Sequence, residues 1–213
     1  MPGLDAGALL LSVSLAAAYY GYLHRQLKRD PHHTVHAVNT VARTRWVETI
    51  MASGKMDVLA VQTLRNSVMA ASFMASTAIL LMIGTLTLSG ADRTASLWHA
   101  LNVGATDPRL IALKLMLLLA DFFFAFFCFS MAVRFFNHVG YMINVPVAHG
   151  LEALAPGRVA SYLNRAGSYY TLGTRAFFFC VPLVFWFFGP HFMLAATAAL
   201  IAALYRLDRA PEG

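Results

Sequence analysis

The sequence predicts an all-α integral membrane protein that forms a single membrane domain over residues 1–213. Four transmembrane helices place both termini outside (N-out/C-out), with one or two interfacial helices on the cytoplasmic side. Hydrophobic residues make up 59% of the chain, and the mean hydropathy of +0.61 is typical of membrane proteins. Four apolar stretches approach or exceed the about 20 residues needed to cross a bilayer core. These stretches cover about residues 4–23, 68–88, 110–136 and 176–205.

Basic residues are concentrated in two of the connections between these stretches. Seven lysines and arginines lie between the first and second stretches, and four lie from the end of the third to the start of the fourth. The opposite side carries four arginines. The positive-inside rule therefore places the linkers 24–67 and 137–175 in the cytoplasm. This topology and contact with anionic lipid headgroups account for the net charge of +6, so no nucleic-acid partner is expected.

The first apolar stretch is expected to be a retained helix and not a cleaved signal peptide. A signal peptide needs a basic segment before its apolar core. Here the only charge before the core is Asp5, and the basic cluster of Arg25, Lys28 and Arg29 follows it. This order favours a membrane helix whose N-terminus lies outside.

The linker after this helix is predicted to contain an interfacial helix. Pro31 ends any continuation of the first helix. Apolar residues then recur every four positions, at Val38, Ala42, Trp46 and Ile50. An apolar row flanked by cations is typical of a helix that lies in the membrane interface. Ser53 and Gly54 break this segment.

The next helix is predicted to run from Met56 to Leu88, with its first turns projecting below the membrane. Inside the bilayer Ala71 and Ala75 are small residues four positions apart, a spacing that allows another helix to approach closely. These faces are the expected contacts of a homo-oligomer. Residues 89–108 are expected to form the outer connection.

The third stretch carries Lys114 and Asp121, the residues that are most costly to place in a membrane. They are seven positions apart, which puts them on one helix face about 10 Å from each other. An ionisable residue near the middle of a bilayer is a functional candidate. Asp121 is interpreted either as a carboxylate that handles a proton or cation along a path, or as a structural partner of Lys114, Arg134 or a neighbouring hydroxyl.

The last stretch is interrupted by Gly189 and Pro190, after a short helix predicted from Arg158 to Tyr170. One interpretation is a single tilted and kinked helix over residues 176–205. The other is two short segments that fold back on each other, which moves the C-terminus to the cytoplasm. The kinked helix is preferred because each half alone is shorter than a span requires.

A second candidate site is a group of basic and amide side chains at the cytoplasmic ends of three helices. Guanidinium and amide groups together suit a phosphate, a carboxylate or another small anion. The alternative is that these residues only follow the positive-inside rule and contact lipid phosphates. The group consists of Gln62, Arg65, Asn66, Arg134, Asn137 and Arg175.

No cofactor, metal or disulfide is expected. Cys128 and Cys180 both lie in apolar stretches, where a thiol packs as a small hydrophobe. His32, His33 and His36 lack accompanying ligands at zinc spacing. His24 and His138 are the only reasonable haem pair, because both fall near the inner boundary. The familiar hydrolase and metalloprotease motifs are missing from the sequence, which makes an enzyme less expected.

Three short stretches are similar to a known family: residues 61–72 read VQTLRNSVMAAS, residues 171–179 read TLGTRAFFF, and residues 185–190 read FWFFGP. With the four-span layout they resemble the bacterial inner-membrane family catalogued as domain of unknown function 599, over roughly residues 9–204. The resemblance implies a small four-helix protein of the bacterial inner membrane, and it implies no activity. It also draws attention to Gln62, Arg65, Asn66, Gly173 and Arg175, which lie in these stretches.

Buried charge in a small membrane protein favours transport. The first hypothesis is a small homo-oligomeric channel or transporter for an ion or small anionic solute, with Asp121 and Lys114 in the membrane and Arg65, Asn66 and Arg175 at the inner mouth. A homo-oligomer is expected because four spans barely enclose a path. The alternatives are a non-catalytic scaffold protein that binds lipid and a partner membrane complex, and a haem- or quinone-binding redox protein.

Overall fold

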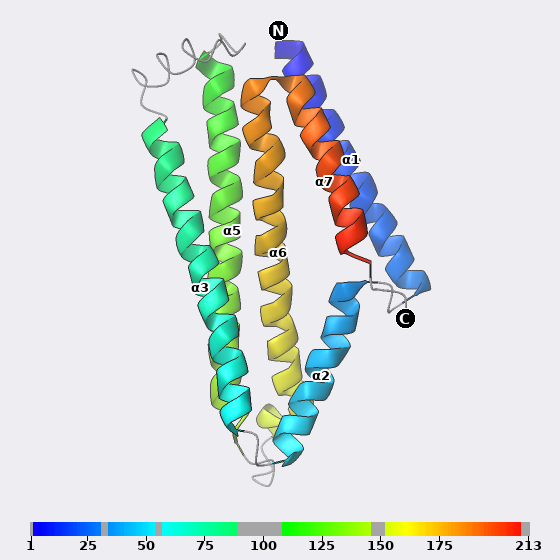
Figure 1. The fold of residues 1–213 in the computed structure, drawn as a ribbon, viewed down its shortest axis with the longest axis vertical. Coiled ribbons are helices and arrows are strands. Elements are labelled where there is room, and N and C mark those ends of the chain that lie inside the picture. The colour runs from blue at the N-terminus through cyan, green and yellow to red at the C-terminus, as the bar shows by residue number, and fades with distance from the viewer. Residues whose placement is uncertain (1, 31–33, 54–56, 89–107, 146–151, 210–213) are drawn as a thin grey trace. The chain divides into compact units, whose positions relative to one another are not determined.

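A computed structural model describes residues 2–30, 34–53, 57–88, 108–145 and 152–209, and they fold into α-helices with one short 3-10 turn (Figure 1). Residues 89–107 of the predicted outer connection, together with His32 and His33, lie outside the described residues. The helices are α1 (Pro2–Arg29), α2 (Val35–Ser53), α3 (Asp57–Leu88), α5 (Pro108–Met142), α6 (Pro156–Phe188) and α7 (Pro190–Leu207), and the 3-10 turn is η2 (Glu152–Leu154).

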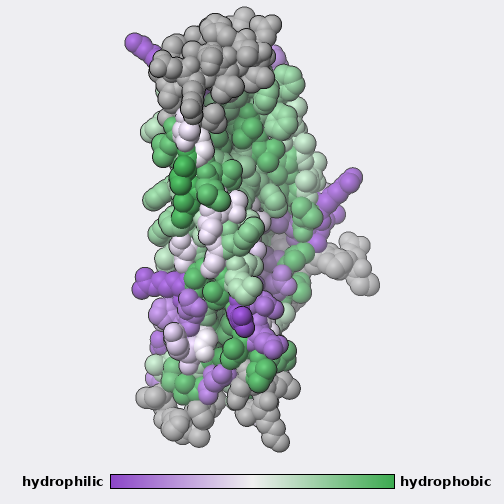
Figure 2. All heavy atoms as spheres, turned by 60° about the vertical axis from the view of Figure 1, so that its left-hand side comes forward, coloured by the Kyte–Doolittle hydropathy of each residue, from purple (hydrophilic) through white to green (hydrophobic). Residues whose placement is uncertain are grey.

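Five of these helices, α1, α3, α5, α6 and α7, are long and apolar enough to cross a membrane. Their outward surfaces carry large hydrophobic side chains in contact with solvent, among them Phe73 (73% exposed), Leu80 (68%) and Met116 (65%). Figure 2 shows such hydrophobic side chains over much of the face in view. Surfaces of this kind are stable in lipid and not in water. The all-helical, membrane-type fold is therefore confirmed.

The prediction of a single kinked helix over residues 176–205 is wrong. Two helices lie there, α6 and α7, and they fold back on each other at Gly189, so that Arg175 of α6 lies 2.9 Å from Asp208 just beyond α7. The error arose because α6 extends back to Pro156 and takes in the predicted short helix, so it is much longer than a half-stretch. The four spans and the N-out/C-out topology are not confirmed, because five helices qualify as spans.

Backbone conformation at Gly189 explains where the chain turns. Its φ of 140° and ψ of 163° belong to a region that is essentially restricted to glycine. Pro190 follows as the first residue of α7, where the missing N–H is not needed for helix hydrogen bonds. The glycine allows the turn and the proline starts the next helix.

The chain divides into two compact units. The first unit comprises Met1–Val35, Ile79–Phe124 and Arg175–Gly213, and the second comprises residues 36–78 and 125–174. In the first unit α1 and α7 lie side by side (Figure 1). The buried Thr197 hydroxyl of α7 contacts the buried Ser12 hydroxyl of α1 at 3.1 Å. The helices from the two ends of the sequence are thus packed together.

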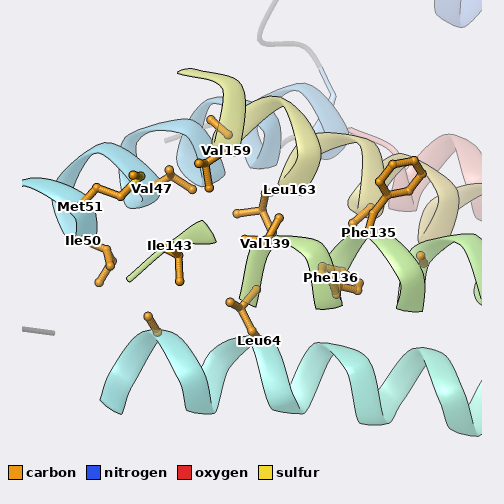
Figure 3. Packing of buried hydrophobic residues seen from close by; sticks show 14 of the residues in the cluster. Val47, Ile50, Met51, Leu64, Phe135, Phe136, Val139, Ile143, Val159 and Leu163 are labelled. Carbon is orange, nitrogen blue, oxygen red and sulfur yellow. The ribbon is translucent and has the colours of Figure 1, made fainter. Parts of the chain in front are cut away.

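The second unit has its own hydrophobic core, which Figure 3 shows between α2, α3, α5 and α6. Val47 and Ile50 of α2 are buried there with Leu64 of α3 and Val139 of α5. The helix predicted in the first linker is confirmed, including its end at Ser53. Its buried face is displaced from the predicted apolar row, because Val38 is 41% exposed.

Candidate functional site

Lys114 of α5 forms a buried charge cluster with Asp5 of α1 and Trp186 of α6 in the first unit. The Lys114 ammonium lies 3.0 Å from Asp5 Oδ1 and donates a hydrogen bond of 2.9 Å to the backbone oxygen of Trp186. The indole Nε1 of Trp186 donates to Asp5 Oδ1 at 2.8 Å, and the ammonium lies 4.9 Å from the ring centroid. Only 1% of the Lys114 side chain is exposed. The cluster is therefore internally neutral and closed to solvent.

This pairing answers one of the questions that the sequence left open. Lys114 and Asp121 both lie on α5, but the ion pair of Lys114 is with Asp5 of α1. Sequence reasoning noted Asp5 only as the charge preceding the first apolar core. A carboxylate at the start of a membrane helix, together with a lysine near the start of another, is a signal that could have suggested the pair.

Asp121 has a different environment in the same unit. Its Oδ2 atom is buried and makes no hydrogen bond to any described residue. The neighbouring residues in α5, Leu118 and Phe122, belong to a hydrophobic cluster packed by Phe177 and Cys180 of α6. The Sγ atom of Cys180 donates to the backbone oxygen of Phe177 at 2.9 Å. A carboxylate oxygen is thus held in apolar surroundings without a partner among the described residues.

Arg175 belongs to a second polar cluster of the first unit. Its Nη2 donates to both carboxylate oxygens of Asp208 at 2.9 Å, and the Tyr19 hydroxyl of α1 donates to Asp208 Oδ2 at 2.7 Å. The guanidinium also lies 5.2 Å from the centre of the Tyr20 ring. Asp208 in turn caps α7, because its N–H donates to the oxygen of Leu204. Sequence reasoning missed Tyr19 and Asp208. Asp208 joins Arg175 to Tyr19 of α1 and to the C-terminal end of α7.

The other predicted anion-binding residues lie in the second unit, whereas Arg175 lies in the first. Gln62, Arg65 and Asn66 are exposed on α3, and Arg134 and Asn137 are exposed on α5. Within the described part of the chain no hydrogen bond or ion pair joins these side chains to one another. Their role as an anion site stays a prediction.

The two histidines considered as a haem pair belong to different units. His24 belongs to the first unit and His138 to the second, where the His138 ring lies 6.2 Å from that of Tyr162. Among residues that the structure describes, no group of three or more His, Cys, Asp or Glu side chains is placed to hold a metal ion. Cys128 and Cys180 are free thiols.

The long apolar helices and the buried, neutralised charges of the first unit define a multi-pass α-helical membrane protein. The chain belongs to the family described as "Protein of unknown function, DUF599", whose model matches residues 8–212. The resemblance in the three short sequence stretches is therefore confirmed over nearly the whole chain. Comparison with curated proteins and with solved structures gave no match.

Proposed function

We propose that this protein transports a proton or a small cation across a membrane, and that Asp121 is the intramembrane carboxylate that accepts it. The buried, unpartnered Oδ2 of Asp121 carries the proposal. Removing a carboxylate oxygen from water without a hydrogen-bond donor costs free energy, and a structural role alone does not offset that cost. An ionisable residue at this depth is a candidate for an ion or proton path.

The position of Asp121 along α5 supports this proposal. The helix has 35 residues and is about 50 Å long, and Asp121 lies about 20 Å from its first residue. A carboxylate at that depth is out of reach of either aqueous phase by its own side chain. A mobile ion would have to reach it through the protein.

The pairing of the basic residues favours a cation over an anion. Lys114 is neutralised by Asp5 and Arg175 by Asp208, so neither offers a free positive charge to an anionic solute. The Asp121 carboxylate remains for a proton or cation.

A five-span orientation agrees with the distribution of basic residues. When α6 and α7 both cross the membrane, Arg206 and Arg209 lie on the same side as the two linkers. The number of basic residues on that side then rises from eleven to thirteen, and Arg93 and Arg109 remain on the other side. We therefore propose an N-out, C-in protein of the bacterial inner membrane that contacts anionic lipids. Its path is proposed to be completed by a homo-oligomer.

The experiment is ion flux into liposomes that contain the purified protein and a pH-sensitive dye. With an imposed membrane potential, the wild-type protein is expected to acidify the lumen faster than empty liposomes, or to take up ²²Na⁺ in a parallel assay. The variant Asp121→Asn is isosteric and cannot bind the ion. Its flux should therefore fall at least about tenfold, which is the effect of losing one charged interaction.

The matched control is Glu48→Gln, which removes an equally negative side chain from an exposed ion pair with Arg45 on α2. It is expected to leave flux unchanged, since exposed pairs contribute little. Equal flux from the wild-type protein and Asp121→Asn, with both variants monodisperse by gel filtration, would contradict the proposal. So would wild-type flux of both ions at the level of empty liposomes.

A further inference from the structure

A polar cluster in the second unit surrounds Arg43 of α2, a residue that the proposed transport function does not use. The Arg43 cluster consists of Thr40, Arg43 and Thr44 of α2 with Asn164 and Gly167 of α6. Arg43 Nε donates to Asn164 Oδ1 at 3.0 Å, and its Nη2 contacts Thr40 Oγ1 at 3.3 Å. Asn164 Nδ2 donates to Thr44 Oγ1 at 3.0 Å. Both ends of the Asn164 amide are therefore used, which fixes the orientation of its carbonyl toward Arg43.

The hydroxyl groups of the cluster cannot neutralise the guanidinium. Thr40 donates its proton to the backbone oxygen of His36 and Thr44 donates to that of Thr40, each at 2.9 Å. Only oxygen lone pairs face Arg43 and Asn164, and these carry no net charge. Within the described residues no carboxylate oxygen lies within ion-pair distance of Arg43. This separates Arg43 from Lys114 and Arg175, whose charges are matched by Asp5 and Asp208.

Gly167 lets the guanidinium lie against the α6 backbone. A Cβ atom at this position would come 2.6 Å from both Cζ and Nη1 of Arg43, so any larger residue would displace the guanidinium. The arginine is half-buried as a result, and burial lowers the pKa of its guanidinium from the ordinary value. An arginine nevertheless stays protonated in proteins. A positive charge is thus partly withdrawn from water and is held in place by neutral groups.

We propose that the Arg43 cluster is a binding site for a phosphate group, presented either by a phospholipid headgroup or by a soluble phosphate. A guanidinium has five N–H donors, and Asn164 and Thr40 account for two hydrogen bonds. The rest of the fork is free of described partners and has the planar geometry that matches two phosphate oxygens. The anion supplies the missing negative charge. This site differs from the predicted group around Arg65 and Arg134, and it does not depend on transport.

The test compares phosphate binding by the full-length protein and by Arg43→Gln in detergent. The first probe is inorganic phosphate, and its binding is measured as a shift in the midpoint of thermal unfolding relative to chloride at equal ionic strength. The second probe is phosphatidylglycerol, and its binding is measured by titration in native mass spectrometry. Arg43→Gln should weaken binding by about tenfold or more, the effect of losing a charged hydrogen bond. The control is Arg45→Gln, which removes an exposed arginine two residues away on the same helix and should bind as the wild type does.

A second variant keeps the charge and changes only the geometry. Gly167→Ala must displace the guanidinium, so it should also weaken binding, and it decides the matter if Arg43→Gln is not monodisperse. Arg43-dependent binding of phosphatidylglycerol alone identifies a lipid site. Arg43-dependent binding of both probes, with phosphate displacing the lipid, identifies a site for soluble phosphate as well. Equal affinity of the wild-type protein, Arg43→Gln and Gly167→Ala for both probes overturns the inference, as does wild-type protein that binds neither.

Discussion

The ammonium of Lys114 lies 3.0 Å from the carboxylate of Asp5, and the two side chains are 1% and 9% exposed. The pair joins the first turn of α1 to α5. Trp186 of α6 donates its indole N–H to the carboxylate and accepts a hydrogen bond from the ammonium through its backbone oxygen. Because both charges are removed from solvent, each depends on the other. Removing one partner leaves a buried charge without compensation, whereas removing both does not.

We therefore expect Lys114→Met and Asp5→Asn each to lower the free energy of unfolding by about 3–5 kcal/mol. The double variant should cost clearly less than the sum of the two single changes. Thermal unfolding in detergent, followed by tryptophan fluorescence, measures all three. The exposed pair of Arg45 and Glu48 is the control, and its removal should change stability by less than about 1 kcal/mol. Additive losses from Lys114 and Asp5 would show that the buried pair is not coupled.

The two partners of the Asp208 carboxylate, Arg175 and Tyr19, should contribute unequally to the free energy of unfolding. Asp208→Asn weakens both hydrogen bonds to Arg175 and leaves that cation without a counter-ion, so we expect a loss of about 1–3 kcal/mol. Tyr19→Phe removes only one hydroxyl and should cost about 0.5–1.5 kcal/mol. The same unfolding assay ranks the two. A larger loss from Tyr19→Phe than from Asp208→Asn would contradict the assigned role of the ion pair.

Two glycine-to-alanine changes should shift the free energy of unfolding in opposite directions. At Gly189 the positive φ of 140° strains any other residue, so Gly189→Ala should cost about 1–3 kcal/mol, although its Cβ would meet Phe192 only at an ordinary 3.7 Å. Gly84 lies inside α3 with no atom within 4 Å of a Cβ, so Gly84→Ala should stabilise by about 0.5–1 kcal/mol. Midpoints of thermal unfolding that move in the same direction for both variants would disprove this distinction.

Gly173 allows close packing within the second unit. A Cβ at this position would lie 2.9 Å from Cε1 and Cζ of Phe129, a ring that is fully buried and stacks edge to face on Tyr170. We expect Gly173→Ala to cost about 1–3 kcal/mol through overpacking. Gly157→Ala on the same helix has open space around the new methyl group and serves as the control. Comparable stability of the two variants would mean that Phe129 moves aside at little cost.

The sequence predicted the helices that are bounded by strong local signals. The helix predicted from Met56 to Leu88 is observed as Asp57–Leu88, because a serine-glycine break precedes it and a long apolar run fills it. By contrast, Asn164, Arg165 and Arg175 interrupt the hydrophobic pattern of α6, so its first half was assigned to a linker. In the structure Asn164 bonds to Arg43, and Arg175 bonds to Asp208. These polar residues are satisfied by tertiary partners that no local pattern reveals.

The same reason limits the prediction of the site. Helical spacing correctly puts Lys114 and Asp121 on one helix. It cannot show that a carboxylate on another helix lies closer to the Lys114 ammonium. Asp5 and Asp208 lie near the two ends of the sequence, and each pairs with a cation on a different helix, Asp5 with Lys114 of α5 and Asp208 with Arg175 of α6. Asp121 was identified from its depth in an apolar stretch, a local property, and its buried oxygen without a described partner agrees with that reasoning.

The pairing of α1 with α7 has a consequence for biosynthesis. The ribosome makes α1 before α7, so α1 has no helix to pack on along this face until α7 has been synthesised. Its Tyr19 hydroxyl gains Asp208, and the backbone N–H of Val35 gains the oxygen of the same residue, only after Asp208 has been added. The α1 surface that α7 covers must therefore stay without its partner helix while α3, α5 and α6 are being made.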